Sequence, residues 1–170
     1  MANKYLKNNA GVLTEEEAIQ TSAGAGDAGK IPALDSAGRL DSTVMPVGIG
    51  ADTASVATSE NLAAGDIVDI YDVTGTPTAR KADGSTAGKY ATGFVLVATT
   101  SPGNALVYFE GQNNQLTGLT PGARMYLSAT TPGAVTAAAP TGVGQVVQYV
   151  GRAISATAIA FEPAQPIVLA

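Results

Sequence analysis

The chain has 170 residues, a net charge of −5, and no histidine, cysteine or tryptophan. Without imidazole or thiol groups it cannot hold a Ser–His–Asp triad, a cysteine nucleophile, or a zinc, copper or iron site of the usual ligands. Its nine scattered lysines and arginines make no basic face for nucleic acid, and no apolar run approaches the ~20 residues that cross a bilayer. We therefore expect no enzymatic activity, no cofactor or metal, and no nucleic-acid or membrane partner.

The chain also carries few charges. Charged residues make up 14% of it and aromatic residues 5%, while hydrophobic residues make up 45%. So few charges protect a monomer poorly against self-association, and we expect copies of the chain or a partner to cover much of its surface. The positively charged start, with Lys4 and Lys7, is not followed by the apolar segment of a secretory signal. We expect synthesis in the cytoplasm.

The first third of the chain, residues 1–53, has sparse apolar residues without a sustained period. Thr14 to Glu17 has the pattern of a capping box, which predicts one short helix over residues 14–21. The segment Gly24-Ala-Gly-Asp-Ala-Gly29 has the spelling of a dinucleotide-binding loop. No hydrophobic strand precedes it and no helical pattern follows it, so we interpret it as a flexible linker.

Further along, Leu-Asp-Ser occurs twice, at positions 34–36 and 40–42, and prolines hold the flanks of this segment extended. A segment so poor in apolar residues cannot offset its own ordering entropy. We therefore expect residues 1–53 to be an extended, mostly irregular N-terminal arm, with at most one short helix, that orders against a partner. Its apolar side chains are the predicted contact residues: Ile31, Pro32, Leu34, Leu40, Val44, Met45 and Pro46.

From residue 54 to residue 170 the pattern is strand, turn, strand. Phe94 to Val97 is apolar on both faces, which indicates a strand that is central or lies at a subunit contact. Eight or so short strands with regular turn signals and no helical segments between them predict an all-β domain, a small barrel or sandwich. The expected strands lie near residues 66–73, 78–82, 89–100, 105–110, 123–128, 134–138, 144–154 and 157–162, with an edge tail at 167–169.

Two features of this region allow alternative interpretations. Asp66, Asp69 and Asp72 alternate between the two faces of one expected strand, which favours a solubilising, exposed strand face over a weak calcium site. The aromatic side chains of the region could form a carbohydrate or base-stacking platform, but core filling by the only large residues is the favoured interpretation. These are Tyr71, Tyr90, Phe94, Tyr108, Phe109, Tyr126, Tyr149 and Phe161.

Two parts of the chain carry a resemblance to a known family. The first is Ile31 to Pro46 with Gly48-Ile-Gly50, and the second comprises Gly122–Ser128, Thr131–Gly133, Gly144–Gly151 and Ala153–Ser155. Together they resemble structural proteins of tailed bacteriophages, in particular the small capsid decoration, or cement, proteins. The motifs are turn and strand patterns rather than catalytic signatures.

The resemblance implies a structural virion protein on the capsid exterior, made in the cytoplasm of a bacterial host. It would bind the major capsid protein of an assembled head as a homotrimer and cement the expanded shell, because binding energy available only in that lattice adds to its stability. The alternative is a tail-fibre or baseplate subunit that recognises host glycans. A third possibility, weighed on the carboxylates alone, is a hydrolase.

Overall fold

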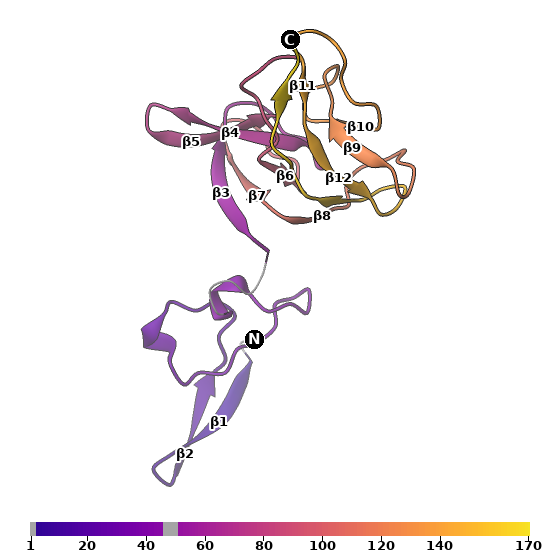
Figure 1. Cartoon of the computed structure of the whole chain (residues 1–170). Coiled ribbons are helices and arrows are strands. Elements are labelled where there is room, and N and C mark those ends of the chain that lie inside the picture. Colours follow the sequence, from indigo (N-terminus) through magenta and orange to yellow (C-terminus); the bar gives the residue numbers. More distant parts are fainter. Residues whose placement is uncertain (1–2, 46–50) are drawn as a thin grey trace. The chain divides into compact units, whose positions relative to one another are not determined.

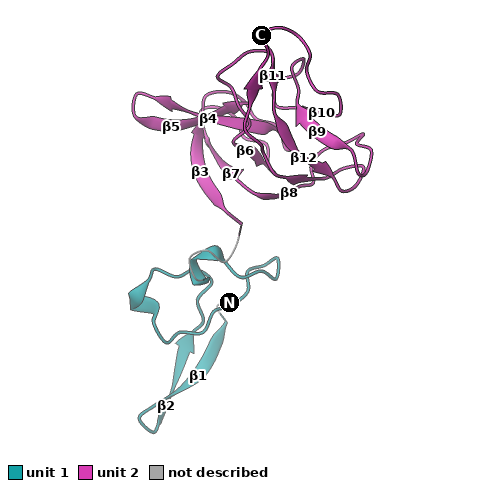
Figure 2. Ribbon diagram, in the orientation of Figure 1, with its two compact units in different colours: residues 1–50 teal, residues 51–170 magenta. Residues whose placement is uncertain are grey.

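Figure 1 shows the computed structural model of the chain, which describes residues 3–45 and 51–170. The chain divides into two compact units, unit 1 with residues 1–50 and unit 2 with residues 51–170 (Figure 2). Both units contain strands, and the helical segments in the described residues are two three-residue 3-10 turns. Neither turn is long enough to cross a membrane. The expected all-β class is confirmed.

Unit 1 begins with a β-hairpin. Strand β1, Lys4–Asn9, pairs antiparallel with β2, Val12–Glu17. The two-residue turn between them, Ala10-Gly11, has φ angles of 51° and 92°. Two left-handed residues in succession are typical of a type I′ turn, whose twist matches that of the flanking strands. The Asn8 side chain accepts a hydrogen bond from the Gly11 amide at 2.8 Å and so fixes the turn.

The helix expected at residues 14–21 is wrong, because residues 14–17 belong to β2 and residues 18–21 are not helical. The Thr14 hydroxyl, expected to cap a helix, donates a hydrogen bond to the Lys7 carbonyl of β1. Glu15 forms an ion pair with Lys4 across the hairpin at 3.0 Å. The cross-strand partners on β1 outweigh the local capping pattern, because they satisfy the backbone and the side chains of β2 together.

The rest of unit 1 is irregular and is held by hydrogen bonds. The Ile19 amide donates to the Ile31 carbonyl at 3.1 Å, and the Ala33 amide donates to the Ile19 carbonyl at 2.7 Å. The 3-10 turns η1 and η2 lie at Ala25–Asp27 and Ser42–Val44. The structure therefore does not confirm an extended arm, because the chain folds back on itself within unit 1.

Unit 2 begins with a closed barrel of five strands in the order β3-β5-β4-β6-β7, which confirms the expected barrel. The strand β3 pairs parallel with β5 and antiparallel with β7, and these two pairings close the barrel. The strands β4 and β5 form a hairpin that is visible in Figure 1. The bounds are Thr53–Thr58 for β3, Ile67–Val73 for β4, Thr76–Lys81 for β5, Gly93–Val95 for β6 and Asn104–Tyr108 for β7.

The rest of unit 2 is a five-stranded sheet in the order β10-β9-β12-β13-β8 and a two-stranded sheet of β11 and β14. All pairings in these two sheets are antiparallel. The bounds are Gly111–Asn113 for β8, Arg124–Leu127 for β9, Val135–Thr136 for β10, Val146–Val147 for β11, Tyr149–Ala153 for β12, Ile159–Phe161 for β13 and Ile167–Val168 for β14.

Two hydrophobic cores explain why the barrel strands are apolar on both faces. Val68 and Val95 pack inside the barrel, whereas Ile67 and Phe94, their neighbours in sequence, pack against the five-stranded sheet. Successive residues of a strand point to opposite faces, so one strand contributes to both cores. The Phe94 ring lies 5.2 Å from that of Phe161, which joins barrel and sheet. The expectation of a central strand holds for Phe94 and Val95.

Buried amide side chains also connect the barrel to the rest of unit 2. Gln148 accepts a hydrogen bond from the Ala91 amide at 2.7 Å and donates to the Ala91 carbonyl at 3.0 Å. Asn113 donates to the Gly65 carbonyl at 2.8 Å. Both side chains are almost fully buried, at 3% and 0% exposed. These hydrogen-bonded amides favour one position of the barrel relative to the rest of unit 2, because any shift would leave the buried amides without partners.

Candidate interaction surface

Unit 1 is folded without a hydrophobic core. None of its described residues, 3–45, is buried. Seven of its large hydrophobic side chains are exposed instead, with exposed fractions between 37% and 71%. They are Leu6, Val12, Leu13, Ile31, Leu34, Leu40 and Met45.

The interactions that hold unit 1 together are polar and exposed. Lys7 pairs with Glu16 at 3.2 Å on the hairpin, and the Ser22 amide donates to the Thr43 hydroxyl at 2.8 Å. Exposed ion pairs contribute only about 0–1 kcal/mol each, and a neutral hydrogen bond about 1 kcal/mol. Burial of apolar area, the largest favourable contribution in most domains, is missing from the described part of this unit.

A hollow of about 270 Å³ lies on unit 1 between the 19–32 segment and the η2 turn. An ion pair between Lys30 and Asp27, 2.8 Å long, contributes to its lining. The hydrogen bond from Lys30 lowers the pKa of Asp27, and the same pair raises the pKa of Lys30. Both groups are therefore charged near neutral pH, and the hollow combines one ion pair with apolar walls.

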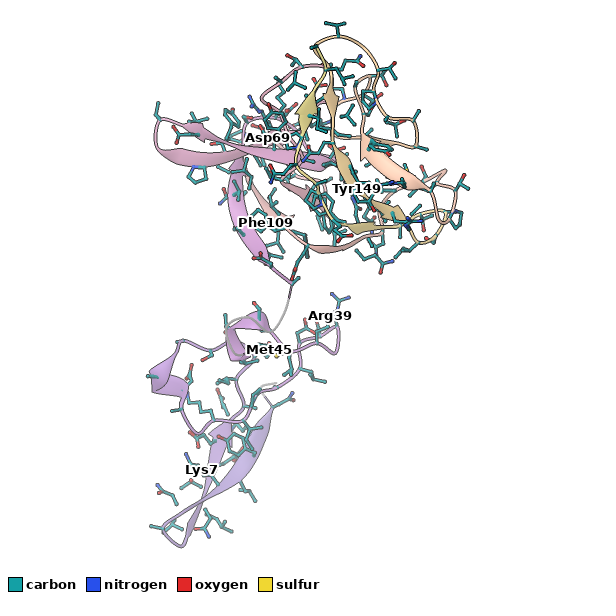
Figure 3. All side chains as sticks on the ribbon, viewed as in Figure 1. Lys7, Arg39, Met45, Asp69, Phe109 and Tyr149 are labelled. Carbon is teal, nitrogen blue, oxygen red and sulfur yellow. The ribbon has the colours of Figure 1, made fainter. Side chains whose placement is uncertain are left out.

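The structure separates the seven predicted contact residues into two groups. Pro32, Val44 and Met45 line the hollow, and Met45 is labelled in Figure 3. Ile31, Leu34 and Leu40 are about half exposed and do not line it. The seventh predicted residue, Pro46, lies outside the described residues.

The exposed apolar residues of the hairpin were not predicted from the sequence. Leu6 and Leu13 are 71% and 68% exposed. In the register of the hairpin, Leu6 faces Glu15 and Leu13 faces Asn8, so the two leucines are diagonal neighbours on one face. The signal that could have revealed them is Ala10-Gly11 between two short runs with β-forming residues, a hairpin pattern that the capping-box interpretation displaced.

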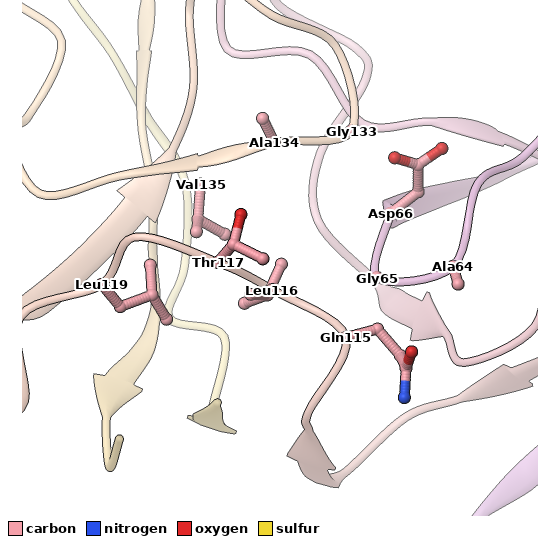
Figure 4. Close-up of a pocket in the computed structure, with 10 residues that line it drawn as sticks. All are labelled: Ala64, Gly65, Asp66, Gln115, Leu116, Thr117, Leu119, Gly133, Ala134 and Val135. Carbon is pink, nitrogen blue, oxygen red and sulfur yellow. The ribbon is translucent and has the colours of Figure 1, made fainter. Parts of the chain in front are cut away.

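Unit 2 has a hollow of about 230 Å³ where the turn before β4 meets the loop after β8 (Figure 4). Its walls include Leu116, Leu119 and Val135. Asp66, its one ionisable lining residue, is already engaged, since it accepts a hydrogen bond from the Ala63 amide at 2.8 Å and pairs with a lysine. The hollow therefore has apolar walls and one carboxylate, which is paired with Lys81, and no second ionisable residue lines it.

The three aspartates expected on one strand have three different environments. Asp72 is exposed at the tip of the β4–β5 hairpin, as expected, but the expectation of an exposed face is wrong for Asp69, which is 5% exposed. Asp69 accepts a hydrogen bond from Arg80 Nε at 2.8 Å and is labelled in Figure 3. Burial raises the pKa of Asp69, and the Arg80 hydrogen bond opposes that rise. No group of three candidate metal ligands occurs among the described residues.

Comparison with known proteins identifies no relative. No family model, curated protein or solved structure matches this chain. A function is therefore inferred from the residues and the geometry of the two units.

Proposed function

We propose that this protein is a structural virion protein that binds the outside of an assembled phage head as a trimer and cements the expanded shell. The observation that carries the proposal is that unit 1 has ordered strands and turns while its described residues bury no side chain. A module of this kind gains stability when a partner covers its apolar residues. In this proposal the partner is the major capsid protein.

Two further observations support an assembly role. The barrel and sheet of unit 2 make a compact body with two cores of aliphatic and aromatic side chains. The resemblance of residues 31–50 and 122–155 to capsid decoration proteins points to the head of a tailed phage. In a lattice with many copies, modest contacts repeated at every site add up to a strong attachment.

The test compares binding of full-length variants to expanded heads that lack this protein. Leu6→Asp combined with Leu34→Asp places charges on two exposed apolar positions of unit 1, and we expect loss of co-sedimentation with heads. The matched control is Val143→Asp, at a residue of unit 2 that is 84% exposed, and it should bind as the unaltered chain does. Equal binding by all three proteins would refute docking through unit 1.

Electron microscopy of virions from a phage with this gene deleted separates the head assignment from the alternative. Loss of density on the head surface supports a decoration protein. Loss of density from the tail fibres or baseplate, together with saccharide binding by the purified chain, would instead establish the adhesin function.

A further inference from the structure

The basic residues of this acidic chain divide sharply by whether they have a counter-ion. All five lysines and Arg80 form ion pairs, whereas Arg39 of unit 1 and Arg124 and Arg152 of unit 2 form none among the residues that the structure describes. Acidic residues outnumber basic ones, 14 to nine. Unpaired arginines are therefore not explained by a shortage of carboxylates within the chain.

The two arginines of unit 2 without an ion pair lie directly opposite each other. Arg124 on β9 pairs in register with Arg152 on β12, and both are exposed. Facing residues of neighbouring antiparallel strands have Cβ atoms about 5 Å apart, and like charges at such positions destabilise a sheet. The arrangement costs the isolated chain stability, and a carboxylate supplied from outside would remove that cost.

Both guanidinium groups are held in place by neighbours that are not acidic. Arg152 Nη1 donates a hydrogen bond to the Gly122 carbonyl at 2.9 Å. The Arg124 guanidinium lies 5.2 Å from the ring centroid of Tyr149, which is labelled in Figure 3. Tyr149 in turn packs edge-on against Tyr126, with centroids 6.2 Å apart. Groups positioned before binding lose less entropy on binding.

We propose that this surface, which we call the arginine face and define as Arg124, Arg152, Tyr126 and Tyr149, binds carboxylates of a second copy of the chain. Arginine and tyrosine are the residue types enriched at the energetic centres of protein interfaces. A planar guanidinium matches a carboxylate with two parallel hydrogen bonds. The chain itself supplies the complementary charge, because it has a net charge of −5.

The matching acidic surface is the acidic end of the barrel, defined as Asp52 and Glu110. Both are exposed, and neither side chain has a hydrogen bond or ion pair among the described residues. Glu110 follows Phe109, whose amide donates to the Asp52 carbonyl at 2.9 Å, so the two acidic residues belong to backbone segments that lie side by side. One copy thus supplies two exposed carboxylates on neighbouring backbone segments, and another supplies the two facing arginines.

This self-contact deepens the proposed function, because it rests on the trimer in that proposal and assigns an interface to it. The two ideas are tested separately. The contact is measured on the purified chain without heads, so its failure would leave docking of unit 1 untouched. Conversely, an adhesin that is not part of the head could still associate in this way.

The experiment measures molar mass in solution by analytical ultracentrifugation over a concentration series. The unaltered chain should associate, and raising the salt from about 50 to about 500 mM should weaken the association, because salt screens exposed ion pairs. Arg124→Glu with Arg152→Glu should weaken it by roughly tenfold or more, since attraction becomes repulsion. The milder pair Arg124→Gln with Arg152→Gln should weaken it less, and it tests the idea even if the glutamate variant does not fold.

Two further variants test whether association depends on these arginines and carboxylates in particular. Arg39→Glu changes an arginine of unit 1 that also forms no ion pair within the described residues, and it should associate normally. The exchanged chain, with Arg124→Glu, Arg152→Glu, Asp52→Arg and Glu110→Arg, keeps the net charge and should recover association. A monomeric unaltered chain, full association of the glutamine pair, or no recovery in the exchanged chain would each overturn the proposal.

Discussion

A substitution at Gln148 tests how the barrel of unit 2 is joined to the rest of the unit. Its side chain is 3% exposed and makes three hydrogen bonds to backbone groups. It bonds the amide and the carbonyl of Ala91 at 2.7 and 3.0 Å, and the carbonyl of Ala164 at 3.1 Å. Gln148→Leu keeps the approximate volume of the side chain and removes all three bonds.

The expected cost follows from those bonds. A net contribution of about 0.5–1.5 kcal/mol for each hydrogen bond sums to about 1.5–4.5 kcal/mol, and part of it is offset by the apolar character of leucine. We therefore expect the free energy of unfolding to fall by about 2–4 kcal/mol. For a unit of 120 residues, with about 2.1 cal/mol/K of unfolding entropy per residue, this lowers Tm by about 8–16 °C.

The assay is urea and thermal unfolding followed by circular dichroism in the far ultraviolet, because the chain has no tryptophan for fluorescence. Gln165→Leu is the matched control, since the same substitution is made at an exposed residue of the C-terminal segment. The control should shift stability by no more than about 0.5 kcal/mol. If both variants shift Tm by the same small amount, the bridging role assigned to Gln148 is wrong.

Three further results are expected. Gly151→Ala should prevent unit 2 from folding, seen as loss of the far-ultraviolet strand signal, because the residue has φ 147° and an added Cβ would overlap a carbonyl oxygen of β13. Arg80→Leu should destabilise unit 2 by about 3–5 kcal/mol in urea unfolding, since it leaves the Asp69 carboxylate buried without its partner. The pKa of Asp27 is lowered mainly by the Lys30 hydrogen bond, so the contribution of this ion pair to the stability of unit 1 should be complete above about pH 4 and be lost as pH falls through the lowered pKa, which amide NMR shifts near Asp27 would follow.

The raised pKa of Asp69 predicts that the stability of unit 2 depends on pH in the opposite direction. Burial raises its pKa above the ordinary value of 3.8, so the folded chain binds this proton more tightly than the unfolded chain does. The contribution of Asp69 to stability is therefore greatest below pH 3.8 and declines as pH rises through the raised pKa. In Asp69→Asn this decline should disappear from the pH profile of urea unfolding.

The class of the fold was predictable because strand and turn signals are local. Alternation of apolar and polar residues, together with glycine, proline and asparagine at turns, predicts strands without knowledge of their partners. The same local reasoning failed at residues 14–17, where a capping-box pattern and a hairpin strand share one sequence. The choice between them depends on β1, whose residues lie across the hairpin.

The amino-acid sequence was enough to predict an all-β fold and to show an acidic chain without histidine or cysteine, because composition and short-range periodicity do not depend on the partner of a strand. Only the tertiary structure decided that Asp69 is buried beside Arg80, that Leu6 and Leu13 share an open face, and that Arg124 faces Arg152. Each of these pairs joins residues of different strands, and strand register alone brings their side chains together.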